Sequence, residues 1–261
     1  MGLDSPPVSE PTAIVRRPSP RLAEGLVTHL ERHAVDPALA LQQWEGYVAA
    51  LRDHGWSIVE AEPADECPDG VFVEDTAVVL GGMAVMTRPG APRRRAEVGS
   101  MASALAGIGL EPRSIEAPAV LDGGDVMAVG STVYVGLGSR TDEDGAAQLG
   151  RLLLAVGMSV VTVPLSRVLH LKSAATALPD GTVIGYPAAL DDAAVFDPFL
   201  AAPEASGAHV VRLGGNALLM ATGAPRSAEL LAARGYWPVE VEIGEFEKLE
   251  GCVTCLSVRV R

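Results

Sequence analysis

The sequence predicts an α/β fold built from a repeated unit, arranged as a propeller or a solenoid. Strand-like runs recur along the chain, and their onsets are separated by 49, 48, 41 and 43 residues. Most runs are followed by a second apolar strand and a helical pattern, and a further strand closes the unit. A period of about 40–50 residues is typical of such repeat architectures. The alternative is an ordinary α/β protein, whose βαβ units have a similar spacing.

The expected elements follow one another in a regular order. A strand at 12–16 comes first, then a helix at 36–54 and a strand in WSIVEAE. The recurring runs begin at Val71, Val120, Val168, His209 and Cys252. Helices are expected at 97–108, 143–156, 192–200 and 227–234, and closing strands at 159–165 and 238–243. The last unit is incomplete, and the strand at 12–16 can complete it, which would close a ring and remove an exposed sheet edge.

Composition indicates an ordinary globular protein of 261 residues, with 48% hydrophobic and 20% charged residues. Residues 1–10 are polar and are expected to form a disordered tail, with 11–261 as a single domain.

No apolar run reaches the ~18 residues that span a bilayer, and the start does not resemble a signal peptide. Three cysteines are odd in number and too few for a disulfide scaffold. We therefore expect a cytoplasmic location and no membrane partner.

The charge of the chain argues against nucleic acid as a partner. The formal net charge is −13, whereas nucleic acids and anionic membranes require a concentrated cationic surface. The basic cluster at 93–95 is too short to change this expectation. An acidic surface instead favours cationic ligands, weakly because of screening by salt.

Cys255, in GCVTCLSV, is a candidate nucleophile within a strand-like alternation. A thiol attacks as the thiolate and needs a nearby base or cation; a buried structural cysteine is the commoner alternative. Cys252 and Cys255 also form a C-x-x-C pair, which can be redox-active or half of a zinc site. The pair is expected on an apolar strand and no second ligand pair exists, so both of these interpretations are disfavoured.

Polar groups in apolar surroundings supply further candidates. His170, in RVLHLKSA, is either a satisfied core residue or a general acid/base. Glu74 and Asp75 interrupt an apolar strand in PDGVFVEDTAVV, and buried carboxylates are costly unless paired, which suggests a cationic ligand. Asp122 and Asp125 flank two glycines in VLDGGDVMAV; they either cap a turn or lie where the backbone approaches a neighbour closely.

Two arginines occupy equivalent places in their units. Arg94, in TRPGAPRRRAE, and Arg140, in GLGSRTDEDGA, each follow a second strand and precede a helix. Arginine suits bidentate binding of a carboxylate. A solvent-exposed arginine at a helix start is the alternative.

Together these motifs resemble the dimethylarginine dimethylaminohydrolases, a family of the guanidine-modifying superfamily that also contains arginine deiminases and amidinotransferases. The matching segments run in order along most of the chain: AIVRRP, FVEDTAVV, TRPGAPRRR, LDGGDV, GLGSRT, HLKS, GGN and TCLS. The resemblance implies a pentein, a five-bladed α/β propeller of ββαβ units with pseudo-fivefold symmetry. Its active site would lie in the central channel.

The resemblance implies a catalytic triad. Cys255, rather than Cys252, would be the nucleophile, His170 the general acid/base, and Asp122 the carboxylate that orients the imidazole.

It also implies substrate contacts. Asp75 would bind the guanidinium nitrogens with Glu74 in support, and Asp69 would contact the α-amino group. Arg94 and Arg140 would bind the α-carboxylate, and Leu249 would line the site. Residues 17 to about 28 would form a mobile lid. Glu250 stands where animal members of the family carry aspartate.

The activity that the resemblance implies is hydrolysis of asymmetric dimethylarginine or monomethylarginine to citrulline and a methylamine. The reaction would pass through a thiouronium intermediate on cysteine, with no metal or organic cofactor. The expected partner is the small-molecule substrate. The protein itself would be a monomer or a homodimer. The alternatives are arginine deimination, amidino transfer, or a non-catalytic propeller that binds a cationic ligand.

Overall fold

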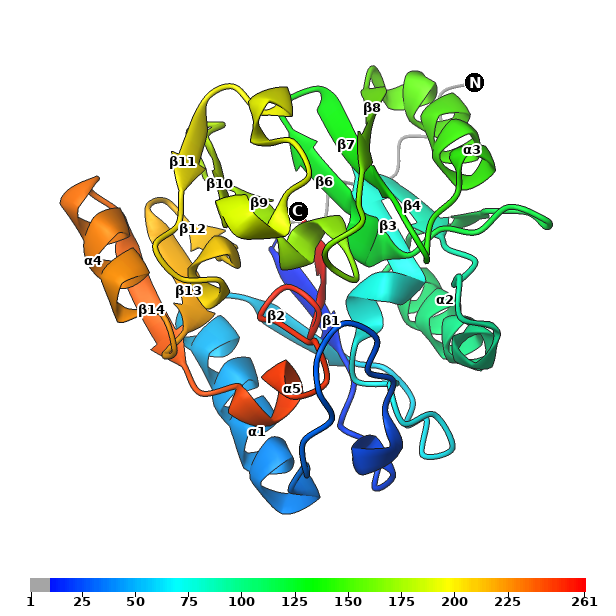
Figure 1. Ribbon diagram of the computed structural model, residues 1–261. Coiled ribbons are helices and arrows are strands. Elements are labelled where there is room, and N and C mark those ends of the chain that lie inside the picture. Colours follow the sequence, from blue (N-terminus) through cyan, green and yellow to red (C-terminus); the bar gives the residue numbers. More distant parts are fainter. Residues whose placement is uncertain (1–9) are drawn as a thin grey trace.

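Five three-stranded sheets surround a central axis in the computed structural model, which describes residues 10–261 (Figure 1). In every sheet the first strand pairs antiparallel with the middle strand, which runs parallel to the third. This repeated order is the pentein propeller that the sequence predicts. The tail expected at 1–10 lies, apart from residue 10, outside the described residues.

The sheets follow the chain in order. The first contains β3 (Ala77–Leu80), β4 (Met83–Met86) and β5 (Arg113–Ser114). The second contains β6 (Val126–Val129), β7 (Thr132–Leu137) and β8 (Ser159–Pro164). The third contains β9 (Ala175–Ala177), β10 (Val183–Gly185) and β11 (Phe199–Ala201). The fourth contains β12 (Val211–Gly214), β13 (Ala217–Ala221) and β14 (Trp237–Val241). The fifth contains β15 (Val258–Val260), β1 (Thr12–Val15) and β2 (Ser57–Glu60).

The fifth sheet joins the two ends of the described chain. β1 lies between β15, to which it runs antiparallel, and β2, to which it runs parallel. The prediction that an N-terminal strand completes the last unit is therefore confirmed. The ring closes because β15 alone could not form a sheet, and β1 supplies its missing neighbour.

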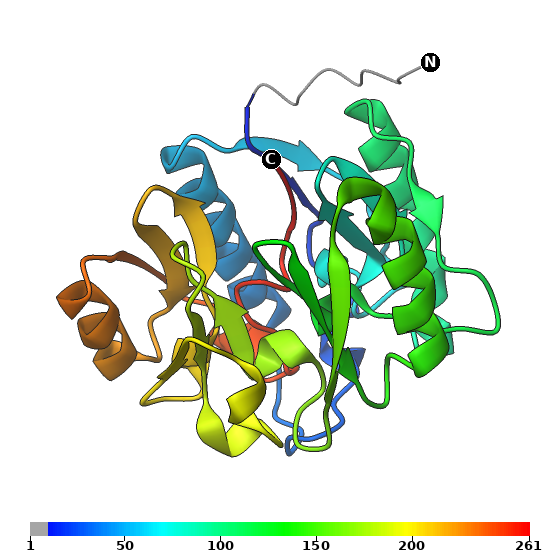
Figure 2. The same cartoon turned by 90° about the horizontal axis from the view of Figure 1, so that it is seen from above.

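The long helices lie on the outside of the ring (Figures 1 and 2). They are α1 (Pro37–Asp53), α2 (Val98–Gly107), α3 (Glu143–Leu153) and α4 (Pro225–Ala233), and a short α5 (Gly244–Glu247) follows β14. Asp36 caps α1 by accepting hydrogen bonds from the backbone of Ala38 and Leu39, and a proline occupies the first turn. Within residues 10–261, no helix combines the length and apolarity needed to cross a bilayer.

One predicted helix is wrong. Residues 192–200 form only a single 3₁₀ turn, Ala193–Val195, before β11 begins at Phe199. Pro198 explains the difference, because proline lacks an amide donor and disfavours the α conformation of the residue before it.

The recurring apolar runs are not strands from their first residue. Each begins with a tight turn, and the first strand of the sheet follows. In the first three units the turns are η2 (Val73–Thr76), η4 (Gly123–Asp125) and η6 (Leu171–Ser173). Cys255 also lies on a turn rather than in a strand, since its backbone N–H donates to the Cys252 carbonyl at 3.1 Å, and β15 begins at Val258. The residues of η2 and η4 are buried, and apolar residues flank each turn, so the runs resemble strands in the sequence.

Candidate active site

A small pocket at the channel axis gathers most of the residues that the sequence singles out. Its lining includes Asp69, Asp75, Arg94, Arg140, His170, Leu249 and Cys255. Asp122 and Glu74 are not in this lining. Asp122 lies behind His170, and Glu74 faces a second cavity.

The repeat explains why residues far apart in sequence meet here. Asp75 lies in η2, His170 immediately precedes η6, and Cys255 lies in the turn before β15. These turns occupy equivalent positions in three different units. Because the units are related by rotation about the channel, equivalent turns converge on the axis.

His170 is held by a fully buried carboxylate. Its Nε2 lies 2.9 Å from Oδ2 of Asp122, whose Oδ1 accepts a hydrogen bond from the Gly90 backbone at 2.9 Å. Nδ1 lies 3.7 Å from Oδ1 of Asp75. The ring is therefore fixed with Nε2 on Asp122 and Nδ1 beside the pocket carboxylate.

Three carboxylates determine the charge of this histidine. Burial alone would lower the pKa of His170, but Asp75, the hydrogen bond to Asp122 and the charge of Asp125 raise it to about 10. His170 is therefore an imidazolium at neutral pH. A protonated histidine can act as a general acid on a leaving group.

Asp75 remains ionised because cations surround it. Burial would raise the pKa of its carboxyl group, but the charges of His170 and Arg94 lower it below the ordinary value. Arg94 Nη1 donates to Oδ2 of Asp75, and the Gly124 backbone N–H donates to Oδ1 at 3.0 Å. The pocket thus presents a fixed anion to a cationic ligand.

Arg94 itself is committed to groups of the protein. Besides Asp75, it donates to the Glu97 carboxylate at 2.7 and 3.1 Å and to the carbonyl of Phe72 at 3.0 Å. Its side chain is 5% exposed. Arg94 therefore orients Asp75, whereas the sequence predicts that it binds a substrate carboxylate. Glu97 shows no motif of its own, so sequence reasoning missed this partner.

Gly124 makes the approach of these groups possible. A Cβ atom at this position would lie 2.6 Å from Oδ1 of Asp75 and 2.7 Å from Nδ1 of His170. At Gly123, a Cβ would lie 2.0 Å from the Glu74 carbonyl oxygen. The interpretation that the two glycines permit close backbone approach is confirmed.

Asp125 is a second carboxylate beneath the histidine. Its Oδ1 accepts from the Leu171 backbone at 3.0 Å, and its Oδ2 accepts from Thr141 Oγ1 at 2.6 Å. Burial raises its pKa to about 6, against the charge of His170 and these hydrogen bonds. Asp125 therefore fixes the turn that carries His170. The sequence left it open between a turn cap and a site residue.

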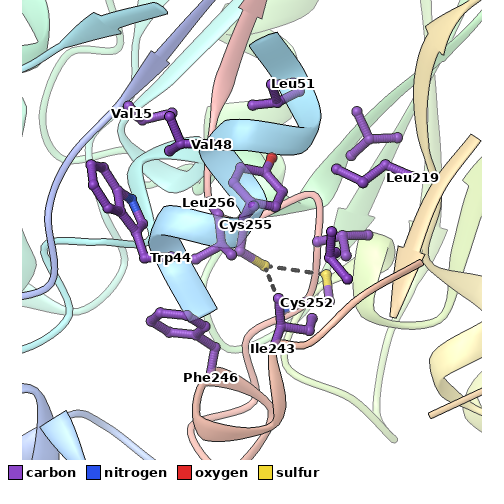
Figure 3. Packing of buried hydrophobic residues seen from close by; sticks show 14 of the residues in the cluster. Val15, Trp44, Val48, Leu51, Leu219, Ile243, Phe246, Cys252, Cys255 and Leu256 are labelled. Carbon is purple, nitrogen blue, oxygen red and sulfur yellow. Dashed lines mark hydrogen bonds between the residues drawn. The ribbon is translucent and has the colours of Figure 1, made fainter. Parts of the chain in front are cut away.

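Cys255 shares its environment with Cys252 (Figure 3). The two sulfur atoms lie 3.3 Å apart, and the Cys252 backbone N–H donates to Sγ of Cys255 at 3.4 Å. The hydrogen bond with Cys252, burial, and the charges of Glu74 and Asp75 raise the pKa of the Cys255 thiol. In the free protein this thiol is therefore protonated at neutral pH. A bound cation would favour the thiolate, which is the reactive form.

No protein-family model matches the chain. The N(G),N(G)-dimethylarginine dimethylaminohydrolase of Streptomyces coelicolor is 59% identical over 249 residues, covering 95% of this chain and 96% of the relative. The enzyme of that name from Pseudomonas aeruginosa is 34% identical, covering 94% of this chain and 98% of the relative. The chain belongs to the dimethylarginine dimethylaminohydrolase family.

Solved structures agree with this membership. A cysteine-to-serine mutant of the dimethylarginine dimethylaminohydrolase from Pseudomonas aeruginosa, complexed with citrulline, has a TM-score of 0.87 and 32% identity, covering 95% of this chain and 98% of that one. The N-terminal domain of a cyanobacterial arginine dihydrolase has a TM-score of 0.86 at 21% identity, covering 97% of this chain and 98% of that one. The second likeness shows the shared fold alone.

Glu74 is the family-motif acid that the structure places away from the pocket. Its Oε1 lies 2.6 Å from Lys172 Nζ and accepts from Arg259 Nη2 at 2.6 Å. Burial would raise its pKa, but these two cations lower it. The prediction that Glu74 supports guanidinium binding beside Asp75 is not reflected in this arrangement. Adjacent side chains of the turn point to opposite sides, so Glu74 faces the other end of the channel.

Residues 26–30, hereafter the lid segment because they overlap the lid expected at 17 to about 28, contact residues that line the pocket of this dimethylarginine dimethylaminohydrolase family member. The Leu26 backbone donates to Asp69 at 2.8 Å, and those of Thr28 and Leu30 donate to Glu250 at 2.9 and 3.0 Å. Arg140 Nη2 lies 3.4 Å from Thr28 Oγ1. The remaining pocket volume is about 20 Å³, enough for one water molecule.

The same carboxylates raise the question of a metal ion. The ligand atoms of Asp75, Asp122 and His170 all lie within 4.8 Å of one another. However, His170 carries a positive charge and Arg94 forms an ion pair with Asp75. These cations already neutralise the carboxylates and would repel a metal, so the residues present fit a proton-transfer site better than a metal site.

Proposed function

We propose that this chain hydrolyses Nω-methylated arginines to citrulline and a methylamine. The observation that carries the proposal is one pocket lined by a buried thiol, an imidazolium held by a carboxylate, and a second carboxylate fixed as an anion. A planar cation that binds the anion would meet the thiol and the imidazolium together. The 59% identity with a relative named for this activity supports the same substrate class.

Substrate binding exchanges contacts within the protein for contacts with the ligand. Asp69 accepts a backbone N–H of the lid segment, and an α-ammonium group offers the same kind of donor. Among residues 10–261, the only hydrogen bond of the Arg140 guanidinium is a long one to Thr28, so its remaining N–H groups can bind an α-carboxylate. We assign the guanidinium to Asp75, which Arg94 holds in place. Leu249 lines the wall beside them.

The substrate activates the nucleophile. The guanidinium on Asp75 brings a positive charge next to Cys255, which lowers the pKa of the thiol, and the thiol proton leaves to solvent. The sulfur anion then bonds to the central guanidinium carbon, and a C–N π electron pair moves onto nitrogen. The backbone N–H of Cys252 donates to Sγ of Cys255. This contact would stabilise the anion, because hydrogen bonds to a charged acceptor are stronger than neutral ones.

Protons then pass through Nδ1 of His170. Nδ1–H protonates the dimethylamino nitrogen, the C–N bond breaks, and dimethylamine leaves behind a thiouronium ion on Cys255. The neutral imidazole next removes a proton from water, and the hydroxide adds to the same carbon. Breaking of the C–S bond regenerates the thiolate, and the remaining hydroxyl proton passes to solvent, which leaves neutral citrulline. Asp122 stays on Nε2 and keeps the ring oriented throughout.

We propose that residues 11–261 act as one catalytic domain, as a monomer or homodimer, in the cytoplasm. Cys67, Cys252 and Cys255 are all free thiols, which suits a reducing compartment.

Citrulline formation tests the proposed function. The purified chain is incubated separately with asymmetric dimethylarginine, monomethylarginine and arginine, and citrulline is measured. We expect faster turnover of the methylated substrates. Much faster turnover of arginine would instead indicate a deiminase, and the absence of citrulline from all three would indicate a binding protein.

A further inference from the structure

We propose that the end of the central channel opposite the active site binds a small polyanion through its phosphate or carboxylate groups. A cavity of about 440 Å³ lies there, hereafter the far cavity, and the first strand of every sheet contributes to its wall. The volume suits a ligand of metabolite size. The pocket that holds Cys255 and His170 has a different lining, so the far cavity is a separate site.

The charge of the far cavity is opposite to that of the whole chain. Its lining includes four cations, Lys172, Arg212, Arg259 and Arg261, and one acid, Glu74. The whole chain carries a formal charge of −13. The cations of the lining therefore outnumber its acid. A concentration of cations in an acidic protein would attract anions selectively.

The four cations differ in how many of their N–H groups already bind acceptors of the protein. Arg259 is committed, because it donates to the Thr254 and Ser257 carbonyls at 2.9 and 3.0 Å and to Glu74 at 2.6 Å. Lys172 is likewise paired with Glu74 at 2.6 Å. Both cations contact Oε1 of Glu74, so its single negative charge is already shared between them and does not neutralise Arg212 and Arg261.

Arg212 and Arg261 supply the free donors. Among residues 10–261, no hydrogen bond from the Arg212 guanidinium is found. The Arg261 guanidinium lies 4.5 Å above the Trp56 ring, and its Nη2 donates to the Arg212 carbonyl. Stacking on an indole fixes the plane of a guanidinium while leaving its edge N–H groups open, and that edge matches a carboxylate or phosphate.

The positive charges of Arg212, Arg259 and Arg261 repel one another. Burial and the charge of Arg259 lower the pKa of Arg212. Burial and the charges of Arg212 and Arg259 lower that of Arg261. An anion between these side chains would relieve the repulsion and accept the unused N–H groups.

The far cavity is adjacent to the catalytic turn. Glu74 pairs with Arg259, its backbone N–H donates to the Cys255 carbonyl at 3.2 Å, and its neighbour in sequence is Asp75. An anion that draws Arg259 away from Glu74 would act on the same turn that presents Asp75. Occupancy of the far cavity is therefore expected to change the KM for the guanidinium substrate.

Calorimetric titration of the full chain tests this proposal without turnover. Inorganic phosphate and citrate are titrated separately in a buffer free of other polyanions, at low ionic strength. We expect one site per chain for at least one probe, weakened tenfold or more in Arg212→Gln/Arg261→Gln and retained in Arg212→Lys. Binding of citrate alone would identify a carboxylate site, and binding of phosphate a phosphate site.

Two variants provide the controls. Arg226→Gln removes an exposed arginine that pairs with Glu204 at 3.0 Å, away from the cavity lining, and should leave the affinity unchanged. Arg140→Ala removes the carboxylate partner of the active-site pocket and should also leave it unchanged. The proposal is overturned if neither probe binds, if Arg226→Gln weakens binding as much as the double variant does, or if Arg140→Ala abolishes it. Thermal melting of each variant confirms that it is folded.

Discussion

His170 Nε2 lies 2.9 Å from Asp122 Oδ2, and the two side chains are 4% and 0% exposed. The contact fixes which nitrogen of the ring is free for chemistry. With Nε2 held by Asp122, proton transfer must use Nδ1, which lies on the side of Asp75 and the pocket. The roles of acid and base in the proposed reaction therefore depend on this one hydrogen bond.

The first prediction concerns pH. The reaction requires a Cys255 thiolate and a protonated His170, so activity should rise with pH and then fall as pH passes about 10, where His170 loses its proton. The acidic limb of kcat/KM reports the free enzyme, in which the pKa of the Cys255 thiol is raised. The acidic limb of kcat should lie at lower pH, because the bound guanidinium stabilises the thiolate.

Asp122→Asn sharpens this pH test. It removes the negative charge and the correct hydrogen-bond acceptor for Nε2–H, so the alkaline limb should move to lower pH. The kcat should fall by about 10²–10⁴, the usual contribution of a general acid/base. Full pH–rate profiles of both proteins provide the measurement. An alkaline limb that stays in place in Asp122→Asn would show that His170 is not the titrating acid.

The second prediction concerns Gly124. A methyl group here would meet Asp75 and His170 at 2.6 and 2.7 Å, so Gly124→Ala should separate the two and lower kcat by about 100-fold, the cost expected for a misplacement of ~1 Å. Gly46→Ala is the matched control, since no atom lies within 4 Å of its added Cβ. In mid-helix it should stabilise the fold by about 0.5–1 kcal/mol. Steady-state kinetics and thermal melting of both variants provide the measurement. Equal activities of Gly124→Ala and Gly46→Ala would contradict the proposed crowding at Gly124.

The third prediction separates the two arginines. Arg140→Ala should raise the KM for dimethylarginine while leaving that for a methylated guanidine without a carboxylate unchanged. Arg94→Ala should impair both substrates, because Arg94 is buried against Asp75 and Glu97. If Arg140→Ala weakened both substrates equally, this arginine would be structural. If Arg94→Ala weakened only the amino acid, the carboxylate role that the sequence predicts for Arg94 would be restored.

The fourth prediction concerns the neighbouring cysteine. Cys255→Ser should abolish turnover, whereas Cys252→Ser should retain most of it, because the backbone N–H of residue 252 still donates to Sγ of Cys255. Cys252→Ala removes the side-chain hydrogen bond that raises the pKa of the Cys255 thiol, so its acidic limb should move to lower pH. Kinetics over pH distinguish the three variants. Equal loss in both serine variants would revive a joint role for the C-x-x-C pair.

Much of this architecture could be predicted from the sequence because the strand-like runs recur at a regular spacing. Closure of the ring by 12–16 follows from an incomplete last unit, and β1 does pair with β15. Close approach at Gly123 and Gly124 could be predicted because glycine is the residue that permits it. The resemblance named seven residues that the structure gathers in one pocket.

The direction of side chains on the turns could not be predicted. Glu74 and Asp75 are adjacent, yet one faces the far cavity and the other the active site. The turn η2 resembles a strand in the sequence because apolar residues precede and follow it. Likewise, the commitment of Arg94 to Glu97 depends on how helix and turn pack. Such pairings arise from tertiary contacts that leave no local pattern.

Trapping of the covalent intermediate tests the central claim most directly. The protein is mixed with asymmetric dimethylarginine, quenched in acid within the first turnovers, digested and analysed by tandem mass spectrometry. Cys252 and Cys255 lie between Lys248 and Arg259 and share one tryptic peptide, so fragment ions between Val253 and Thr254 distinguish them. We expect the thiouronium mass on Cys255, together with release of dimethylamine. Sustained citrulline formation with no adduct, or an adduct on Cys252, would contradict the account.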